Sequence, residues 1–294
     1  MTMGVVMHKI KIFFQLTVPE YLIITFFSFF SAYFLFNQII FSASSVLTFI
    51  SLSLGVLALN SFNQVFDFSI DKINKPKRPI VSDRISKKNA LLLACIMFLG
   101  SLLISFLVDY ILFLLVLSFV IISIIYSMPP IRLKKLPLSG MFVGTYLHGV
   151  IPFFSAVVIS NYTNPLYTMV FGLFFILLAF SSSPIKDLED IKGDKNAGLV
   201  SLPLMMGEER AKLTVSLLFS FTGVYLLISI LLNILPMKFL YSLVAYVIIL
   251  LVIFYMLFRY KYKKEVTQSK FLTLIMFLIA IIEVLIVINS KLIL

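Results

Sequence analysis

Long apolar runs separated by short polar connections dominate the chain. A transmembrane helix needs about 20 consecutive, mostly apolar residues, and nine runs meet this requirement. The runs lack the one-by-one alternation over about ten residues that marks the strands of a membrane barrel. The pattern therefore predicts an all-α, polytopic membrane protein with nine transmembrane helices. These helices cover residues 21–41, 46–66, 89–108, 110–127, 138–160, 166–185, 213–235, 239–258 and 271–290.

The amino-acid composition excludes an ordinary soluble protein. Of the 294 residues, 61% are apolar and 13% are charged, whereas soluble domains have about 45–50% apolar and about 25% charged residues. The mean hydropathy is +1.09. A core of ordinary size could not hide so much apolar surface from water, so lipid must solvate much of it. Because the apolar runs fill most of the chain, we expect one transmembrane domain over residues 1–294.

The basic residues report the orientation in the membrane. The net charge is +11, from 24 Lys and Arg against 13 Asp and Glu. In a soluble protein this excess would suggest a nucleic-acid partner, but here 22 of the 24 fall in the N-terminal tail and in the connections after the even-numbered helices. The other two are Lys238 and Lys291. Since cytoplasmic connections are enriched in Lys and Arg, we expect a cytoplasmic N-terminus, an external C-terminus and no nucleic-acid partner.

A first acidic cluster follows the second predicted helix. Asn63, Asp67 and Asp71 are spaced i, i+4, i+8, which on a helix places them in one stripe about 12 Å long. A basic turn comes next, in which Pro76 and Pro79 end the helix. The stripe is therefore predicted to lie at the cytoplasmic end of a transmembrane helix.

A second acidic cluster follows the sixth predicted helix. Asp187, Asp190 and Asp194 are spaced i, i+3, i+7, again one face of a helix. Gly193 is expected to end the regular helix just before Asp194. The chain thus carries two carboxylate stripes on the same predicted side of the membrane.

Carboxylates at this spacing suit a hard divalent cation. Mg²⁺ takes one or two protein carboxylates and completes its octahedron with water and substrate phosphate oxygens. Neighbouring Lys and Arg side chains would neutralise further phosphate charge, and the apolar helices would bury a hydrocarbon tail. Either cluster alone is typical of a solvated loop, but the pair predicts a Mg²⁺-dependent site for a lipid diphosphate.

The clusters and their surroundings resemble the UbiA superfamily of intramembrane prenyltransferases. The first cluster has the family form NxxxDxxxD followed by INKPxRPI, and the second resembles KDIEDxxGD followed by GxxTLP. A further family feature, YSxPPxRLK, is also present. These motifs stand at residues 63–71, 73–80, 186–194, 198–203 and 126–134. The resemblance implies nine helices around a central cavity that opens at the cytoplasmic side.

The resemblance also implies roles for individual residues. The implied catalytic residues are Asn63, Asp67, Asp71, Asp187, Asp190 and Asp194. The implied Mg²⁺ ligands are Asp67, Asp71, Asp190 and Asp194, with Asp187 as the alternative to Asp194. The implied substrate-binding residues are Lys72, Arg78, Tyr126, Arg132, Lys134 and Lys186. Tyr126 would stabilise an allylic cation through its ring.

Two positions depart from the family pattern. Ser182 and Ser183 stand where many archaeal relatives carry Arg-Glu, and Val18 stands where relatives often carry Arg. Both changes remove a cation from the expected cavity. No general base is evident, because a lone histidine in a helix such as His148 is more often structural than catalytic. Glu283, inside the last predicted helix, is a functional candidate by its position alone.

The implied activity is Mg²⁺-dependent transfer of a prenyl group, geranylgeranyl or longer, from an allylic prenyl diphosphate to a lipophilic acceptor in the membrane, with release of diphosphate. The acceptor is either geranylgeranylglyceryl phosphate or an aromatic or quinone precursor, and no obligate protein partner is inferred. The alternative is a secondary transporter or a lipid-binding membrane protein. Transporters hold ion-binding acids near the bilayer midplane, whereas these acids lie at helix ends.

Overall fold

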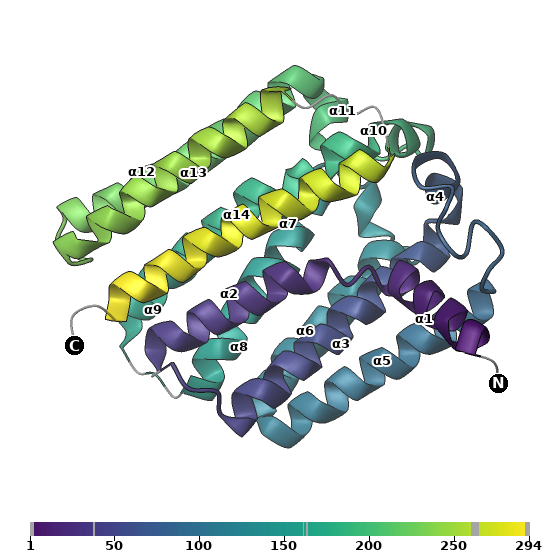
Figure 1. The fold of residues 1–294 in the computed structure, drawn as a ribbon, viewed down its shortest axis with the longest axis horizontal. Helices are drawn as coiled ribbons and strands as arrows, with labels where there is room; N and C mark the ends of the chain where they lie inside the picture. The colour runs from purple at the N-terminus through teal and green to yellow at the C-terminus, as the bar shows by residue number, and fades with distance from the viewer. Residues whose placement is uncertain (1–2, 38, 161, 163, 260–264, 292–294) are drawn as a thin grey trace.

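The chain folds into long helices that run side by side. The computed structural model describes residues 3–37, 39–160, 162, 164–259 and 265–291, without the side chains of residues 4 and 265–269. Every regular element in these ranges is helical. Figure 1 shows the long helices lying nearly parallel, with short helices gathered at one end of the bundle.

The described helices include eight that are long and apolar enough to cross a membrane, or nine if a bent pair counts as one span. Five are unbroken: α3 (Ala43–Phe66), α5 (Lys87–Val108), α6 (Tyr110–Ser127), α12 (Glu208–Leu231) and α14 (Glu265–Lys291). Three are composite: α7 (Ser139–Thr145) with η2 (Tyr146–Val150) and α8 (Ile151–Ser160), α9 (Pro165–Ser182) with η3 (Ser183–Ile185), and η4 (Met237–Phe239) with α13 (Leu240–Arg259). The chain is therefore an integral, multi-pass membrane protein.

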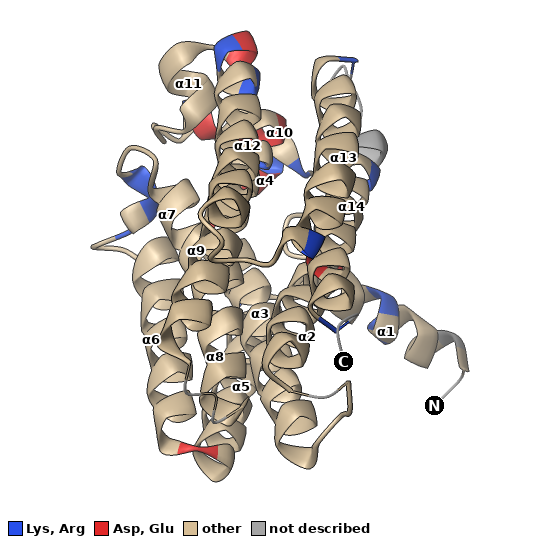
Figure 2. Ribbon diagram, turned by 90° about the vertical axis from the view of Figure 1, so that its left-hand side faces the viewer, with Lys and Arg blue, Asp and Glu red and all other residues tan. Residues whose placement is uncertain are grey.

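The bent pair forms the N-terminal part of the chain. α1 (Met3–Thr17) and α2 (Tyr21–Phe36) meet at a bend of 63°. Val18 sits in the bend with a φ of 47°, a left-handed conformation that is rare for a β-branched residue. Figure 2 shows α1 leaving the side of the bundle. Hydropathy alone predicted one helix over 21–41, but α2 ends at Phe36.

Most predicted helices are confirmed, with shifted ends. The helix predicted over 110–127 has those bounds as α6. α12 begins earlier than the predicted 213, because Gly207, with a φ of 85°, starts a helix whose polar first turn contains Glu208 and Glu209. A count of apolar residues does not detect a polar first turn of this kind, so it begins the helix too late. Lys261, Lys263 and Lys264, counted above among the cytoplasmic basic residues, lie outside the described residues.

Neighbouring helices enclose the middle of the bundle. α14 packs against α2, α2 against α8, α3 against α5 and α6, and α9 against α12. α12, α13 and α14 pack in succession. Between α3 and α5, the buried Ser51 and Ser101 hydroxyls each donate to the other residue's carbonyl at 2.7 Å. Small residues of this kind let transmembrane helices approach closely.

Charged residues gather at one end of the bundle. Figure 2 shows most of the Lys, Arg, Asp and Glu around the short helices α4 (Phe68–Asn74), α10 (Asp187–Asn196) and α11 (Leu202–Met206). At the opposite end Asp109 caps α6, accepting from the backbone N–H groups of Ile111 and Leu112. The acidic motifs therefore lie together at the charged end.

Candidate functional site

The first acidic motif spans a break between two helices. α3 ends at Phe66 and α4 begins at Phe68, with Asp67 between them. The backbone N–H of Asp67 still donates to Asn63 and that of Asp71 to Asp67, both at 2.8 Å. The single predicted helix is thus two helices, although the four-residue hydrogen-bond spacing continues through the break.

Basic side chains compensate the carboxylate at the break. The buried Lys134 ammonium, from η1 (Leu133–Lys135), forms an ion pair with Asp67. Arg132 adds a second contact, with its Nη2 atom 3.5 Å from Asp67 Oδ1. Asn63, one turn earlier, accepts a hydrogen bond from the Ser127 hydroxyl. The YSxPPxRLK segment therefore meets the first acidic motif in space.

The turn after α4 supplies cations to both acidic motifs. Arg78 Nη1 lies 2.5 Å from Oδ2 of the buried Asp71. Lys75 Nζ lies 2.9 Å from Oδ1 of Asp190 and 3.0 Å from its Oδ2. One short turn thus neutralises a carboxylate from each motif.

The Asn74 side chain joins the two motif segments directly. Its amide nitrogen donates to the Asp190 carbonyl at 2.9 Å, and its oxygen accepts from the Gly193 N–H at 2.8 Å. A Cβ atom at position 193 would collide with this amide, so glycine is needed for the close approach. α10 continues through Gly193 to Asn196, and the expected end of the helix at Gly193 is wrong.

The second motif concentrates buried negative charge. Burial raises the pKa of the Asp187 carboxyl to about 7, and nearby Asp194 adds to the rise. Burial and the charge of Asp190 raise the pKa of Asp194 to about 6. At Asp190, burial is outweighed by Lys75 and Lys186, which hold its pKa below the usual range.

This donor set fits a hard cation such as Mg²⁺. A divalent ion would remove the mutual repulsion of these carboxylates and prefers their oxygens as ligands. In the described part of the chain, no three Asp, Glu, His or Cys side chains converge closely enough to hold one ion. Asp67, Asp71 and Asp190 are instead paired with Lys or Arg.

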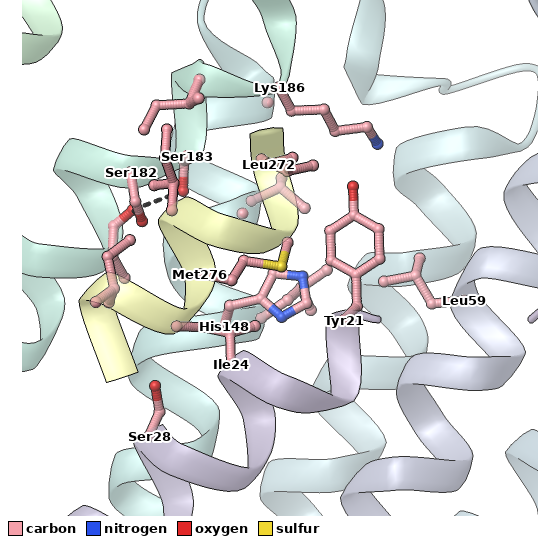
Figure 3. Close-up of a pocket in the computed structure, with 18 of the residues that line it drawn as sticks. Tyr21, Ile24, Ser28, Leu59, His148, Ser182, Ser183, Lys186, Leu272 and Met276 are labelled. Carbon is pink, nitrogen blue, oxygen red and sulfur yellow. Dashed lines mark hydrogen bonds between the residues drawn. The ribbon is translucent and has the colours of Figure 1, made fainter. Parts of the chain in front are cut away.

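A central cavity of about 150 Å³ lies below this charged layer, between α2, α3, η2, α9 and α14. Asn63, Tyr126, Lys186 and Asp187 line its charged end. Figure 3 shows the Tyr21 hydroxyl pointing toward the Lys186 ammonium, whose nitrogen lies 5.7 Å from the Tyr21 ring centre. Leu59, Val143, Leu147, Ile275 and Ile279 are among the apolar residues that line the cavity. The cavity thus offers an ionic head region and a mainly apolar interior, into which a few polar residues such as Ser28 and Glu283 also project.

A second cavity of about 490 Å³, the rim cavity, lies between the α1–α2 bend, the basic turn after α4 and the start of α14. Lys75, Lys77 and Arg78 line it together with Glu20 and Glu189. Tyr21, Leu272 and Met276 line both cavities. The two cavities therefore share a wall.

The structure differs from the sequence-based residue set in a few places. Lys72 is exposed on α4 and lines neither cavity. Asn74, Lys75 and Glu189 were assigned no role, although all three contact or border the acidic segments. The available signal was the family-like turn INKPxRPI, in which Asn74 and Lys75 are the polar residues next to the motif.

Comparison with known proteins agrees with this arrangement. The sequence pattern of the UbiA prenyltransferase family matches residues 21–281. The chain belongs to this family. It is 31% identical to the digeranylgeranylglyceryl phosphate synthase of Thermococcus kodakarensis over 168 residues, which are 57% of this chain and 58% of that relative. The enzyme of the same name from Methanococcus maripaludis strain C5 is 32% identical over 206 residues, or 66% of this chain and 69% of that relative.

Solved structures of UbiA proteins share the fold. A UbiA homologue from Archaeoglobus fulgidus bound to GPP and Mg²⁺ has a TM-score of 0.76 at 20% identity, covering 95% of this chain and 98% of that one. A structure of digeranylgeranylglyceryl phosphate synthase has a TM-score of 0.67 at 22% identity, covering 96% and 98%. The chain spans less than two thirds of the length of the Thermococcus relative that its sequence matches, although the fold match is nearly complete.

We predict that Asn74→Ala loosens the contact between α4 and α10. The change removes two partly buried hydrogen bonds and leaves a backbone carbonyl and N–H without their partner, which costs up to about 1–3 kcal/mol per unsatisfied group. The melting temperature of the protein in detergent should fall. Asn89→Ala, at an exposed position on α5, is the matched control and should leave it unchanged. Equal melting temperatures for the two variants would contradict the bridging role of Asn74.

Proposed function

We propose that the protein transfers a prenyl group from an allylic prenyl diphosphate to a lipophilic acceptor in a Mg²⁺-dependent reaction. The observation that carries the proposal is the joining of the two acidic motifs, through Asn74 and Lys75, at the charged end of an apolar cavity. Family membership supports the reaction class, and the A. fulgidus homologue binds GPP and Mg²⁺. Transport or passive lipid binding has no such support.

Four aspartates are the proposed Mg²⁺ ligands, namely Asp67, Asp71, Asp190 and Asp194, with Asp187 as the alternative to Asp194. Asn63 either binds the ion as a further ligand or orients one of the aspartates. Support comes from their position on segments in contact and from the cations that compensate three of them. Bound Mg²⁺ supplies charge neutralisation for the diphosphate leaving group.

The cations of the site are the proposed diphosphate ligands. Lys75, Arg78 and Lys134 now pair with aspartates, and once Mg²⁺ neutralised those carboxylates, the three cations could bind phosphate oxygens. Arg132 and Lys186 add positive charge nearby. Lys72 is left out, because its side chain is exposed and lines neither cavity. Groups aimed at the charge that develops on the leaving oxygen lower the barrier to C–O cleavage.

The central cavity is the proposed place of the allylic group. Tyr126 lines it beside Asp187: a methyl group on Gly140 would come within 3.5 Å of the Tyr126 hydroxyl and 3.7 Å of the Asp187 carboxylate. This position supports a role of the Tyr126 ring in stabilising the allylic cation. The apolar residues of the cavity exclude water, which would otherwise capture that cation.

Geranylgeranylglyceryl phosphate is the proposed acceptor. The curated relatives reported above are digeranylgeranylglyceryl phosphate synthases, whose product requires a second geranylgeranyl group on a glyceryl phosphate. Such an acceptor needs positive charge beyond the cations assigned to the diphosphate, and the rim cavity, which Lys75 and Arg78 also line, offers Lys77 for it. Lys77 partly offsets the cations missing at Val18 and Ser182. Glu20 and Glu189 also line the rim cavity, so its excess positive charge is small.

We also propose that residues 1–294 form a single transmembrane domain, with the N-terminus in the cytoplasm and the C-terminus outside. Support for the orientation comes from the gathering of basic residues at the end of the bundle that holds α4 and α10, because cytoplasmic connections are enriched in Lys and Arg.

The reaction is tested with purified protein, geranylgeranyl diphosphate, geranylgeranylglyceryl phosphate and Mg²⁺. Asp67→Asn and Asp190→Asn should each lower prenyl transfer by at least about 100-fold, since each removes charge that stabilises the transition state. Chelation of Mg²⁺ should abolish transfer, and added Mg²⁺ should restore it. Asp83→Asn, at an exposed position in the adjacent loop, is the control and should keep full activity. Undiminished transfer by both variants would overturn the proposed function.

The acceptor is tested by incubating the protein with labelled geranylgeranyl diphosphate and either geranylgeranylglyceryl phosphate or an aromatic quinone precursor. We expect product only from the phosphate-bearing acceptor. Lys77→Met should raise KM for that acceptor about tenfold and leave KM for the donor unchanged, because one charge-assisted contact contributes about 1.5–3 kcal/mol. Product from the aromatic compound alone would assign the enzyme to the other acceptor class.

The orientation is tested by thiol labelling in intact cells. On a Cys95→Ser background, which removes the single cysteine, cysteines are introduced by Lys135→Cys and by Met237→Cys at opposite ends of the bundle, both exposed. A membrane-impermeant maleimide should label Met237→Cys at once and Lys135→Cys only after permeabilisation. The reverse order would refute the proposed orientation.

A further inference from the structure

One histidine in the central cavity has no role in the reaction as described above. His148 belongs to η2, a five-residue π-helix between α7 and α8. Single π-helical turns are rare and often mark functional sites. The next residue, Gly149, lies against α9, where an added Cβ would come within 2.6 Å of Ala179 Cβ. This contact fixes the backbone that carries His148.

The imidazole of His148 faces the cavity with unused hydrogen-bonding capacity. Its ring stacks on Tyr21, with 5.8 Å between ring centres and 22° between planes. Nδ1 is buried and has no hydrogen-bond partner among the described residues. Figure 3 shows the ring between Tyr21 and Met276, below the Lys186 ammonium. A buried polar atom without a partner is costly, so a ligand group is the natural partner.

The Lys, Asp and Glu side chains that line the cavity are less suited to accept a proton there. Lys186 is a cation, and Asp187 belongs to the cluster assigned to Mg²⁺. Glu283 accepts from the Ser28 hydroxyl at 2.7 Å, and Ser28 lies seven residues, or about 10 Å of helix, beyond Tyr21. Among these side chains, His148 is therefore the one that can accept a proton between the ionic head region and the apolar part of the cavity.

The wall that the two cavities share lies beside His148. Tyr21 and Met276 line both cavities and flank His148. An acceptor with its phosphate beside Lys77 would extend its glycerol past this wall into the central cavity. Its free hydroxyl would then meet the imidazole, while the allylic carbon approaches from the diphosphate end.

We propose that His148 binds the acceptor hydroxyl and takes its proton during transfer, an inference that rests on the proposed function. The C–O bond to diphosphate breaks with its electron pair leaving on the diphosphate. The acceptor oxygen forms a new bond to the allylic carbon, and its proton passes to an unprotonated nitrogen of His148, then to water at the rim. In a dry cavity, removal of that proton makes the bonding of the acceptor oxygen to the allylic carbon irreversible.

The test uses His148→Ala in the full-length protein, with prenyl ether and free prenol measured alongside diphosphate release. A general base contributes about 10²–10⁴-fold, so ether formation should fall at least about 100-fold while KM for the donor stays unchanged. Imidazole added at millimolar concentration should restore ether formation, because the alanine leaves space for it. His8→Ala, which changes the other histidine at an exposed position on α1, should behave as wild type.

The outcomes separate this proposal from the general one. Wild-type protein that forms no prenyl ether would defeat the proposed function itself. Active wild type together with a folded His148→Ala that keeps its rate, or that imidazole does not rescue, would defeat the role of His148 alone. If His148→Ala does not fold, His148→Gln serves instead. Glutamine can bind the hydroxyl but cannot take its proton, so it should raise the ratio of prenol to ether at least tenfold, and an unchanged ratio overturns the proposal.

Discussion

The structure depends on one constraint: negative charge at the edge of the bilayer must be compensated by neighbouring cations. Carboxylates from two distant segments meet where water gives way to apolar side chains, and each resists ionisation unless a cation lies beside it. Asn74 and Lys75 satisfy this requirement for Asp190, the first by binding the backbone of α10 and the second by pairing with the carboxylate. The geometry of the site follows from this link between α4 and α10.

The sequence predicted the architecture well because lipid imposes a simple rule. A helix must satisfy its own backbone hydrogen bonds and present about 20 apolar residues to the membrane, so counting apolar runs located nearly every helix. The count was less reliable at ends that lie outside the apolar layer. The polar first turn of α12 and the early end of α2 at Phe36 depend on local backbone conformation, which hydropathy does not report.

The site was predictable in its acidic residues and less so in their partners. Spacing alone indicated two stripes with Asp67 and Asp190, because helical periodicity relates residues near in sequence. The contacts of Lys134 with Asp67 and of Asn74 with Gly193 join residues 67 and 119 positions apart. No local pattern contains such pairs. The π-helical turn at His148 was likewise absent from the sequence-based prediction, and its Gly149 packs closely against Ala179 of α9, a contact between residues distant in the sequence.

The bend between α1 and α2 bears on the route by which a lipid substrate would enter the rim cavity. The rim cavity is bounded by Phe14 and Gln15 of α1 on one side and by Leu272 and Met276 of α14 on the other, two elements at opposite ends of the chain. A lipid that entered this cavity between the two elements would keep its hydrocarbon chains in the bilayer. Its encounter with the protein would then be a two-dimensional search, and the governing concentration would be that of molecules per area of membrane.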